Sequence, residues 1–145
     1  MKLRLLTLEE FKPLSEEMHK KCFSDDRPAW SHTCDFVLVA DDADTEKPLG
    51  FLTCFEIDKG QVWIHFGGVF KDNIPTNELG GKYTGRDIFN FGINYLLEQY
   101  ATILLDTKNT NIPMIKIALS TGFLIVGVEC SFKEIYLRMI LENNE

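Results

Sequence analysis

Short apolar runs, separated by turn residues, recur along the chain and predict a protein rich in strands. The runs contain many branched and aromatic side chains, and residues such as Lys59 and Gly60 between them favour turns. These features predict seven strands: Leu3–Leu6, Phe36–Ala40, Leu49–Ile57, Gln61–Phe70, Thr102–Asp106, Leu124–Cys130 and Lys133–Ile140. The second, third and fourth follow one another closely enough to form an antiparallel meander.

Two other segments have apolar residues at the three- and four-residue spacing of a helix. The first follows Thr7 and Glu10, which have the pattern of a capping box. Because a proline cannot sit deep inside a helix, we expect the main helix to begin near Pro13 and to run to Cys22. The second, Gly85–Tyr100, carries an apolar stripe on one face and is the most strongly amphipathic stretch of the chain.

A third helix is marked at both ends by residues that restrict the backbone. Pro113 cannot donate a backbone hydrogen bond and disfavours helical dihedrals at Ile112, so we expect Pro113 to be the first residue of the helix. Gly122 can adopt the left-handed conformation that ends a helix, which lets Phe123 fold back onto the last turn. The pattern is therefore a strand, Asn111, a short helix, Gly-Phe and another strand.

The start of the second helix is a candidate anion site. Unpaired N–H groups and the helix dipole attract an anion to a helix N-terminus, and Gly85 would let the anion approach closely. Lys82 and Arg86 add positive charge there. The same segment also fits a helix start without a ligand, in which Thr84 is the cap and Asp87 interacts favourably with the dipole. The sequence leaves both interpretations open.

Two of these segments resemble signatures of the GNAT N-acetyltransferase superfamily. The run Asn111–Phe123 is similar to the pattern Asn-x-x-(Ala/Ser)-x-x-x-(Tyr/Leu)-x-Lys-x-Gly-Phe and matches its spacing without a gap. The departures from that signature are Met114, Ala118 and Ser120. The run Lys82–Asp87 resembles (Arg/Gln)-x-x-Gly-x-(Gly/Ala), the segment that holds the pyrophosphate of coenzyme A in the family, with Asp87 in place of the small residue.

The resemblance covers nearly the whole chain and implies its fold. A GNAT domain has the order of strands and helices that the pattern predicts, so we expect residues 1–145 to form a single GNAT-like acetyltransferase domain. The implied class is α/β (α+β), with a mixed, mostly antiparallel central sheet of about seven strands flanked by helices. In that fold the strands equivalent to Gln61–Phe70 and Thr102–Asp106 run parallel and splay apart in the middle of the sheet. The cofactor's pantetheine amides would satisfy the backbone groups that the splay exposes.

The resemblance also implies an acyltransferase that uses acetyl-CoA as its co-substrate. The expected cofactor-binding residues are Gly68, Val69, Lys82, Gly85, Arg86 and Asn111. Backbone N–H groups near Gly67, Gly68 and Val69 are candidates for stabilising an oxyanion, because paired glycines in an apolar strand indicate a bulge or close ligand approach. Tight packing of this strand under a helix would explain the glycines equally well.

Direct attack of an amine on a thioester needs a base and a source of protons for the leaving thiolate. His65 is the candidate catalytic base, because a neutral imidazole can take a proton from an ammonium group directly or through water. Glu56 and Asp58 are the alternative carboxylates. The tyrosine that serves as the acid in the family would stand at Ala118, which cannot donate a proton. Water or Tyr136 would then supply the proton, unless the protein does not catalyse the reaction.

Three interpretations of function remain at this stage. The first is an N-acetyltransferase that acts on a primary amine of an unidentified small molecule or peptide. The second is a non-catalytic GNAT-like module that binds an acyl-CoA or a protein partner, which Ala118 and Asp87 favour. The third is a structural α/β domain whose motifs are coincidences of helix capping, and the gap-free spacing of Asn111–Phe123 makes it the weakest. By analogy with the family, Ser24–His32 would shape the acceptor site.

Composition disfavours several kinds of partner and location. Fifteen Lys and Arg against 22 Asp and Glu give a net charge of −7, which disfavours binding to nucleic acid. There is no run of about 18 apolar residues and no amino-terminal signal peptide, so we expect neither membrane insertion nor secretion. Widely spaced cysteines, without a histidine at ligand spacing, favour reduced core thiols in a cytoplasmic protein over a metal site or disulfides: Cys22, Cys34, Cys54 and Cys130. A homodimer stays open.

Overall fold

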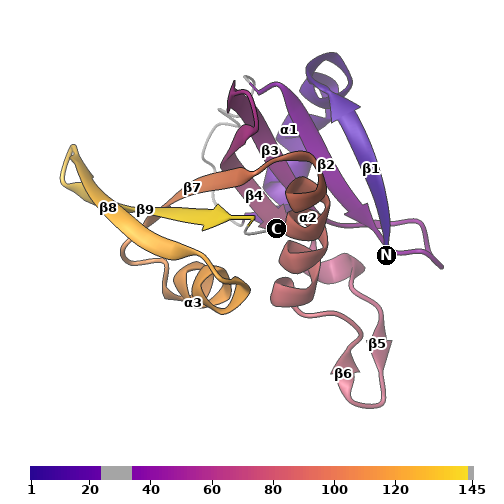
Figure 1. The fold of residues 1–145 in the computed structure, drawn as a ribbon. Helices are drawn as coiled ribbons and strands as arrows, with labels where there is room; N and C mark the ends of the chain where they lie inside the picture. Colours follow the sequence, from indigo (N-terminus) through magenta and orange to yellow (C-terminus); the bar gives the residue numbers. More distant parts are fainter. Residues whose placement is uncertain (24–33, 144–145) are drawn as a thin grey trace.

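The computed structural model describes residues 1–23 and 34–143, in which one seven-stranded sheet is covered by three helices (Figure 1). The strand order is β1-β2-β3-β4-β7-β9-β8, and every neighbouring pair is antiparallel except β4 with β7. The strands of this sheet are β1 (Lys2–Thr7), β2 (Phe36–Asp41), β3 (Pro48–Asp58), β4 (Gln61–Val69), β7 (Thr102–Lys108), β8 (Leu124–Ser131) and β9 (Glu134–Glu142). The helices are α1 (Leu8–Cys22), α2 (Gly85–Gln99) and α3 (Ile112–Thr121). This architecture confirms the predicted fold class.

The parallel strands β4 and β7 are neighbours for only part of their lengths. Their last registered pair is Ile64 with Leu105. β4 continues to Val69 and β7 continues to Lys108, but no further pair joins these extensions. The predicted splayed pair in the middle of the sheet is therefore confirmed.

The two faces of the sheet carry different helices. Phe11 of α1 packs with Val37 of β2 in one buried cluster. The next residue of β2, Leu38, belongs to a second cluster that contains Ile93 of α2 and Ala118 of α3. Because successive side chains of a strand point to opposite faces, α1 covers one face, and α2 and α3 cover the other (Figure 1).

The predicted start of α1 is wrong, because its capping box is complete. Thr7 Oγ1 accepts a hydrogen bond from Glu10 N, and Glu10 Oε1 accepts one from Thr7 N, each at 3.2 Å. The helix therefore begins directly after the box, at Leu8, and not near Pro13. Pro13 lies inside the helix, where it removes one N–H group from the hydrogen-bond ladder close to the first turn.

The ends of α3 agree with the sequence to within one residue. Asn111 is the N-cap, and the helix begins at Ile112, so Pro113 is its second residue and not its first. Gly122 has the left-handed φ of 112° that was the expected stop signal, and Phe123 N donates back to Ala118 O at 3.0 Å. Glycine adopts this φ without strain, and a left-handed residue turns the chain out of the helix, so the helix ends here.

The segment between β4 and α2, predicted to be a plain loop over Lys71–Gly81, contains short elements. They are the 3₁₀ turn η1 (Lys71–Asn73) and a hairpin of β5 (Thr76–Asn77) and β6 (Gly80–Gly81). The hairpin projects from the start of α2, away from the sheet (Figure 1). Leu79 at its tip is 98% exposed.

The four cysteines are free thiols, and one of them lies outside the core. Cys34 and Cys54 are buried, and burial raises the pKa of Cys22 to about 12. Cys130 is exposed, so its assignment to the core is wrong. The reason is topological, because Cys130 belongs to β8 at the edge of the sheet.

Candidate functional site

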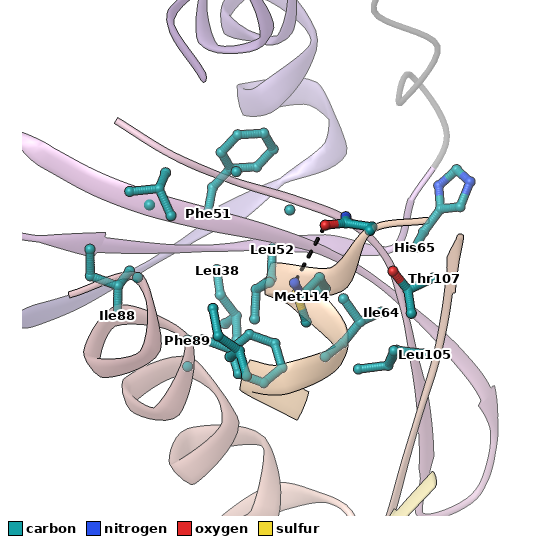
Figure 2. Close-up of a pocket in the computed structure, with 18 of the residues that line it drawn as sticks. Leu38, Phe51, Leu52, Ile64, His65, Ile88, Phe89, Leu105, Thr107 and Met114 are labelled. Carbon is teal, nitrogen blue, oxygen red and sulfur yellow. Dashed lines mark hydrogen bonds between the residues drawn. The ribbon is translucent and has the colours of Figure 1, made fainter. Parts of the chain in front are cut away.

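A cavity of about 760 Å³ lies where β4 and β7 diverge. Its walls come from both splayed strands, from the first turns of α2 and α3, and from the start of β9. Figure 2 shows the apolar side chains that gather between the helices and the sheet: Leu38, Leu52, Ile64, Phe89, Leu105 and Met114. A largely apolar cavity of this size with a few convergent polar groups is typical of a small-molecule site.

Alternate residues of β4 turn their backbone groups toward the cavity. Phe70 N donates to Leu49 O of β3 at 2.9 Å, and the backbone groups of successive strand residues point to opposite sides. The N–H and C=O groups of Gly67 and Val69 therefore point away from β3, toward the side of β7. Those of Gly68 point to β3. Of the two expected cofactor residues on this strand, Val69 thus offers its backbone to the cavity, whereas Gly68 does not.

Packing explains why residue 68 is a glycine. A Cβ at Gly68 would lie 2.7 Å from Cys22 Cβ at the end of α1, closer than two carbon atoms can approach, so tight packing under a helix applies there. A Cβ at Gly67 would lie 2.7 Å from Leu52 Cδ2, the end of a flexible side chain that can move, so close ligand approach stays open for Gly67. The bulge of β4 lies at His65, which the register between β3 and β4 skips.

The start of α2 combines a complete cap with two unsatisfied donors. Asp87 N donates to Thr84 Oγ1 at 3.1 Å, and Thr84 N donates to Asp87 Oδ2 at 2.8 Å. The bonds from Thr84 lower the pKa of Asp87, so its carboxylate is charged at neutral pH. The N–H groups of Gly85 and Arg86 donate no hydrogen bond to any acceptor in residues 1–23 and 34–143. Such donors at a helix N-terminus can bind an anion.

The glycine at the start of α2 is not required by the packing of the protein. A Cβ at Gly85 would meet no atom nearer than 3.9 Å, the distance to Ile117 Cδ1. Gly85 also lines the cavity. The missing side chain therefore leaves open the approach from the cavity to the two donors.

The two cations expected beside α2 have different surroundings. Lys82 Nζ lies 3.1 Å from Asp44 Oδ2 and 3.7 Å from Asp42 Oδ1, both in the turn between β2 and β3. The hydrogen bond to Asp44 raises the pKa of Lys82, and the contact fastens the base of the β5–β6 hairpin to that turn. Arg86 forms no ion pair with any residue that the structure describes. Arg86 is therefore the cation available to a ligand at this helix start.

Asn111 lines the cavity and caps α3. Its Oδ1 accepts a hydrogen bond from Met114 N at 3.4 Å, the dashed line in Figure 2. This cap uses the carbonyl oxygen of the side chain and not its NH₂ group. The amide can therefore brace the helix start and still donate a hydrogen bond toward the cavity.

His65, at the bulge of β4, also lines the cavity. Its ring centroid lies 5.4 Å from that of Phe55 and 5.0 Å from that of Trp63, and Figure 2 shows it on the same side of the apolar cluster as Thr107. Burial lowers the pKa of His65 below its usual 6.5, because the charged form loses solvation. The imidazole is therefore neutral at neutral pH, as a base must be.

Charged and hydroxyl side chains line the cavity where β7 and β9 meet. Lys108 Nζ lies 2.9 Å from Glu134 Oε1, and Tyr136 Oη donates to Glu134 Oε2 at 2.6 Å. Asp106 accepts two hydrogen bonds from Arg138, at 3.0 and 3.1 Å. We call this side of the cavity the polar end; its residues are Asp106, Lys108, Glu134 and Tyr136. The opposite side is the backbone end, lined by Gly67, Val69 and Gly85.

Sequence reasoning found only one member of the polar end, Tyr136. Lys108 and Tyr136 are paired in the register of β7 and β9, although they are far apart in the sequence. Glu134 lies two residues from Tyr136 on the same strand, so both side chains reach the same side of the sheet. The sequence does show polar residues next to the apolar runs that form β7 and β9. It does not show that these two strands become neighbours, so it could not bring the polar residues together.

The alternative carboxylates lie outside the cavity, which corrects the expectation for Glu56 and Asp58. Glu56 accepts a hydrogen bond from Tyr100 Oη, and Asp58 Oδ1 accepts one from Lys59 N in the β3–β4 turn. Both lie opposite the part of β4 that is still paired with β7, whereas the two strands diverge only beyond Ile64. The segment Ser24–His32, expected to shape the acceptor site, lies outside the described residues.

Residues 1–23 and 34–143 contain no group of three or more His, Cys, Asp or Glu that could hold a metal ion. No helix in this part of the chain is long and apolar enough to span a membrane.

No protein-family model and no curated protein matches the sequence. Solved structures match the fold: spermidine N-acetyltransferase from Vibrio cholerae has a TM-score of 0.71 at 15% identity over 97% of this chain and 92% of its own. The ribosomal-protein-S18-alanine N-acetyltransferase from Escherichia coli has a TM-score of 0.67 at 16% identity, covering 97% and 94%. A candidate streptothricin acetyltransferase from Bacillus anthracis, in complex with acetyl coenzyme A, has a TM-score of 0.56 at 19% identity, covering 75% and 62%. The protein therefore has the fold of the GNAT acetyltransferases.

Proposed function

We propose that the protein is an acetyl-CoA-dependent N-acetyltransferase that acts on a primary amine. The observation that carries the proposal is the pair of unsatisfied N–H groups at Gly85 and Arg86, beside the cavity in the splay. Every helix leaves such donors at its start; Gly85 is half-buried and Arg86 is exposed, so an anionic ligand could take the place of water at these N–H groups. The pyrophosphate of coenzyme A would supply the acceptors at this helix start. The acetyl coenzyme A complex among the structures of similar fold supports this choice of ligand.

The backbone end has the donors and acceptors that a pantetheine arm needs. Gly67 and Val69 point N–H and C=O groups toward the cavity, and β7 does not pair with them there. Two amides of an extended ligand could take the place of the missing strand pairing. Arg86 would add charge near the phosphates, and Asn111 could donate from its NH₂ group.

The reaction requires one bond to form and one to break. The amine nitrogen forms a bond to the thioester carbonyl carbon, the carbon–sulfur bond breaks, and the thiolate takes a proton to give free coenzyme A and an amide. His65 would accept the proton that the amine loses, because burial keeps its imidazole neutral. Backbone N–H groups of the β4 extension would stabilise the oxyanion.

Water is the better candidate for protonating the thiolate. Tyr136 directs its hydroxyl hydrogen to Glu134 Oε2 at 2.6 Å. Giving up this hydrogen would leave a phenolate beside the Glu134 carboxylate, and the two negative charges would repel each other. Ala118 is completely buried and has no proton to donate.

A second candidate function is a non-catalytic module that binds acyl-CoA or a protein partner. The observations that favour it are Ala118 and the charged Asp87 in the first turn of α2. A negative charge there opposes a phosphate by Coulomb repulsion. Binding of acetyl-CoA without turnover on any amine would favour this alternative.

The test is isothermal titration calorimetry with acetyl-CoA on the wild-type protein and Gly85→Glu. The added carboxylate would occupy the approach to the two donors and repel the phosphates, so binding should be lost while the fold remains. Gly81→Glu is the matched control, since it adds the same charge in the hairpin, outside the cavity lining. Equal affinity of wild type and Gly85→Glu, or no binding by the folded wild type, would sink the proposal. Transfer assays over an amine panel then separate the two candidates.

A further inference from the structure

The cavity extends well beyond the splay of β4 and β7. Its lining includes Leu38 and Ala40 of β2, and Leu3 of β1 at the edge of the sheet. Neighbouring strands lie about 4.8 Å apart, so the distance across the sheet from β4 to β1 is about 14 Å. We call this extension the apolar lobe; its lining side chains are Leu3, Leu38, Ala40, Leu52, Ile88 and Phe89.

The apolar lobe lies between α2 and the sheet. Leu3 and Ala40 are partners in the register of β1 and β2, so their side chains point to the same face of the sheet. Ala40 packs in one buried cluster with Ile88 of α2, so this is the face that α2 covers. In Figure 2, Leu38 lies between Ile88 of α2 and Ile64, where the splay begins. The apolar lobe is therefore continuous with the cavity at the splay.

The apolar lobe suits a hydrocarbon group and not the polar arm of coenzyme A. Its side chains are all apolar. β2 pairs with β1 and β3, and β3 pairs with β2 and β4, so the backbone groups of these strands bond to one another. The amides of a pantetheine arm would have no partner among the described residues of the lobe, and burial of an amide without a hydrogen bond is unfavourable.

An apolar ligand would restore contacts that the empty lobe lacks. Protein interiors are normally packed as densely as organic crystals, and side chains that face a void lose attractive contacts. An apolar cavity holds water poorly and binds apolar molecules instead. The occupant must also reach the splay, because the lobe and the splay belong to one cavity. A hydrocarbon chain attached to the sulfur end of coenzyme A meets both conditions.

We propose that the apolar lobe binds the acyl chain of a coenzyme A thioester longer than acetyl, so that the protein transfers a medium-chain acyl group. A C–C bond is about 1.5 Å long, so an extended chain of about ten carbon atoms spans the distance from β4 to β1. The inference rests on the proposed function, which places the thioester in the splay. The amine still attacks the thioester carbonyl carbon, the carbon–sulfur bond breaks, and the thiolate takes a proton. Only the acyl group differs.

Isothermal titration calorimetry with acetyl-, hexanoyl- and decanoyl-CoA tests the proposal. Affinity should rise by up to about fourfold per methylene, which corresponds to about 0.8 kcal/mol for each buried CH₂. Decanoyl-CoA should bind at least about tenfold more tightly than acetyl-CoA. A smaller gain would overturn the proposal and leave the proposed function intact. A protein that binds none of the three thioesters would overturn both.

Leu3→Trp tests whether the chain enters the apolar lobe. Leu3 is half-buried, and the larger side chain would fill the far end of the lobe. Affinity for decanoyl-CoA should fall at least about tenfold, while affinity for acetyl-CoA stays at the wild-type value and reports an intact fold. Leu5→Trp is the matched control, since Leu5 lies on the same face of β1 but is 50% exposed and outside the cavity lining.

A second variant guards against misfolding of Leu3→Trp. Ala40→Val makes a smaller change in the same part of the apolar lobe and should lower decanoyl-CoA affinity in the same direction. Wild-type affinity for decanoyl-CoA in both folded lobe variants would overturn the proposal. So would an equal loss in the Leu5→Trp control, because the chain would then lie outside the lobe.

Discussion

The backbone end and the polar end of the cavity are built by different means. At the backbone end, the chemistry comes from N–H and C=O groups of Gly67, Val69 and Gly85, which strand divergence and a helix start leave unpaired. At the polar end it comes from side chains, with Glu134 bridging Lys108 and Tyr136. Backbone groups are placed by the fold and are present with every side chain, except that proline lacks the N–H. Side chains can be exchanged, so on the proposed function we expect the polar end to be the part that adapts to different acceptors.

This comparison predicts a division of labour. Changes at the backbone end should alter acetyl-CoA affinity and leave the choice of amine unchanged. Changes at the polar end should alter the amine preference and leave acetyl-CoA affinity unchanged. A change at one end that altered both acetyl-CoA affinity and amine preference would contradict this division more directly than any loss of activity.

The largest effect is expected at His65, which lies at the bulge between the two ends. His65→Gln should reduce turnover about 10²–10⁴-fold, the usual contribution of a general base. Burial lowers the pKa of His65, so the wild-type rate should rise with pH, with a midpoint below about 6.5, and then level off. The glutamine variant should lack this rise. The measurement is the pH profile of turnover beside acetyl-CoA affinity.

Two outcomes would contradict the proposed role of His65 as the catalytic base. Undiminished turnover in His65→Gln would move proton transfer to water, since Glu56 and Asp58 lie outside the cavity. Loss of acetyl-CoA affinity would mean that the imidazole supports the bulge of β4 and not the chemistry.

The second effect concerns the polar end. Glu134→Gln removes the charge that holds Lys108 and Tyr136 together. The ion pair with Lys108 is partly exposed and contributes at most about 1 kcal/mol, and the hydrogen bond from Tyr136 contributes about 0.5–1.5 kcal/mol. We expect kcat/KM for the amine to fall by about tenfold, with unchanged affinity for acetyl-CoA. Glu56→Gln is the control, because Glu56 bonds Tyr100 away from the cavity. Equal losses in both variants would refute the placement of the two carboxylates.

The sequence located the helix ends beside the cavity to within one residue, because their signals are local. Pro113 and Gly122 bracket α3, and Gly85 stands at the start of an amphipathic helix, so spacing alone locates them. The sequence did not predict the polar end, because Lys108 and Tyr136 are far apart in the sequence and only the register of β7 and β9 brings them together. The sequence also could not show that Lys82 forms an ion pair with Asp44, which makes its charge less available to a ligand.

A third, smaller effect is expected at Asn111, whose two side-chain groups have separate roles. Asn111→Ala should weaken acetyl-CoA binding by about 0.5–1.5 kcal/mol if the NH₂ group donates to the ligand. It should also lower the stability of the fold by about 0.5–2 kcal/mol through loss of the cap on α3. Asn111→Asp retains the cap acceptor for Met114 N but lacks the donor. Calorimetry and thermal unfolding of both variants separate the roles.

The aspartate variant decides between the two roles of Asn111. Weak binding that high salt does not restore, with a wild-type melting temperature, assigns the NH₂ group to the ligand, because salt would screen repulsion by the added carboxylate. Wild-type affinity in both folded variants would leave Asn111 with capping alone.

The smallest effect separates the two cations beside α2. Arg86 forms no ion pair within the described residues and stands next to the free donors, so Arg86→Ala should weaken acetyl-CoA binding by about 0.3–1 kcal/mol, the range for a charge at a helix end. Lys82 is held by Asp42 and Asp44, so Lys82→Ala should leave binding unchanged. Because exposed ion pairs contribute little to stability, its melting temperature should change little. Calorimetry at low and high salt measures both, and the effect of Arg86→Ala should shrink as salt screens the charge. The opposite ranking, with Lys82→Ala the weaker binder, would mean that Lys82 exchanges its aspartates for the phosphates when the ligand binds.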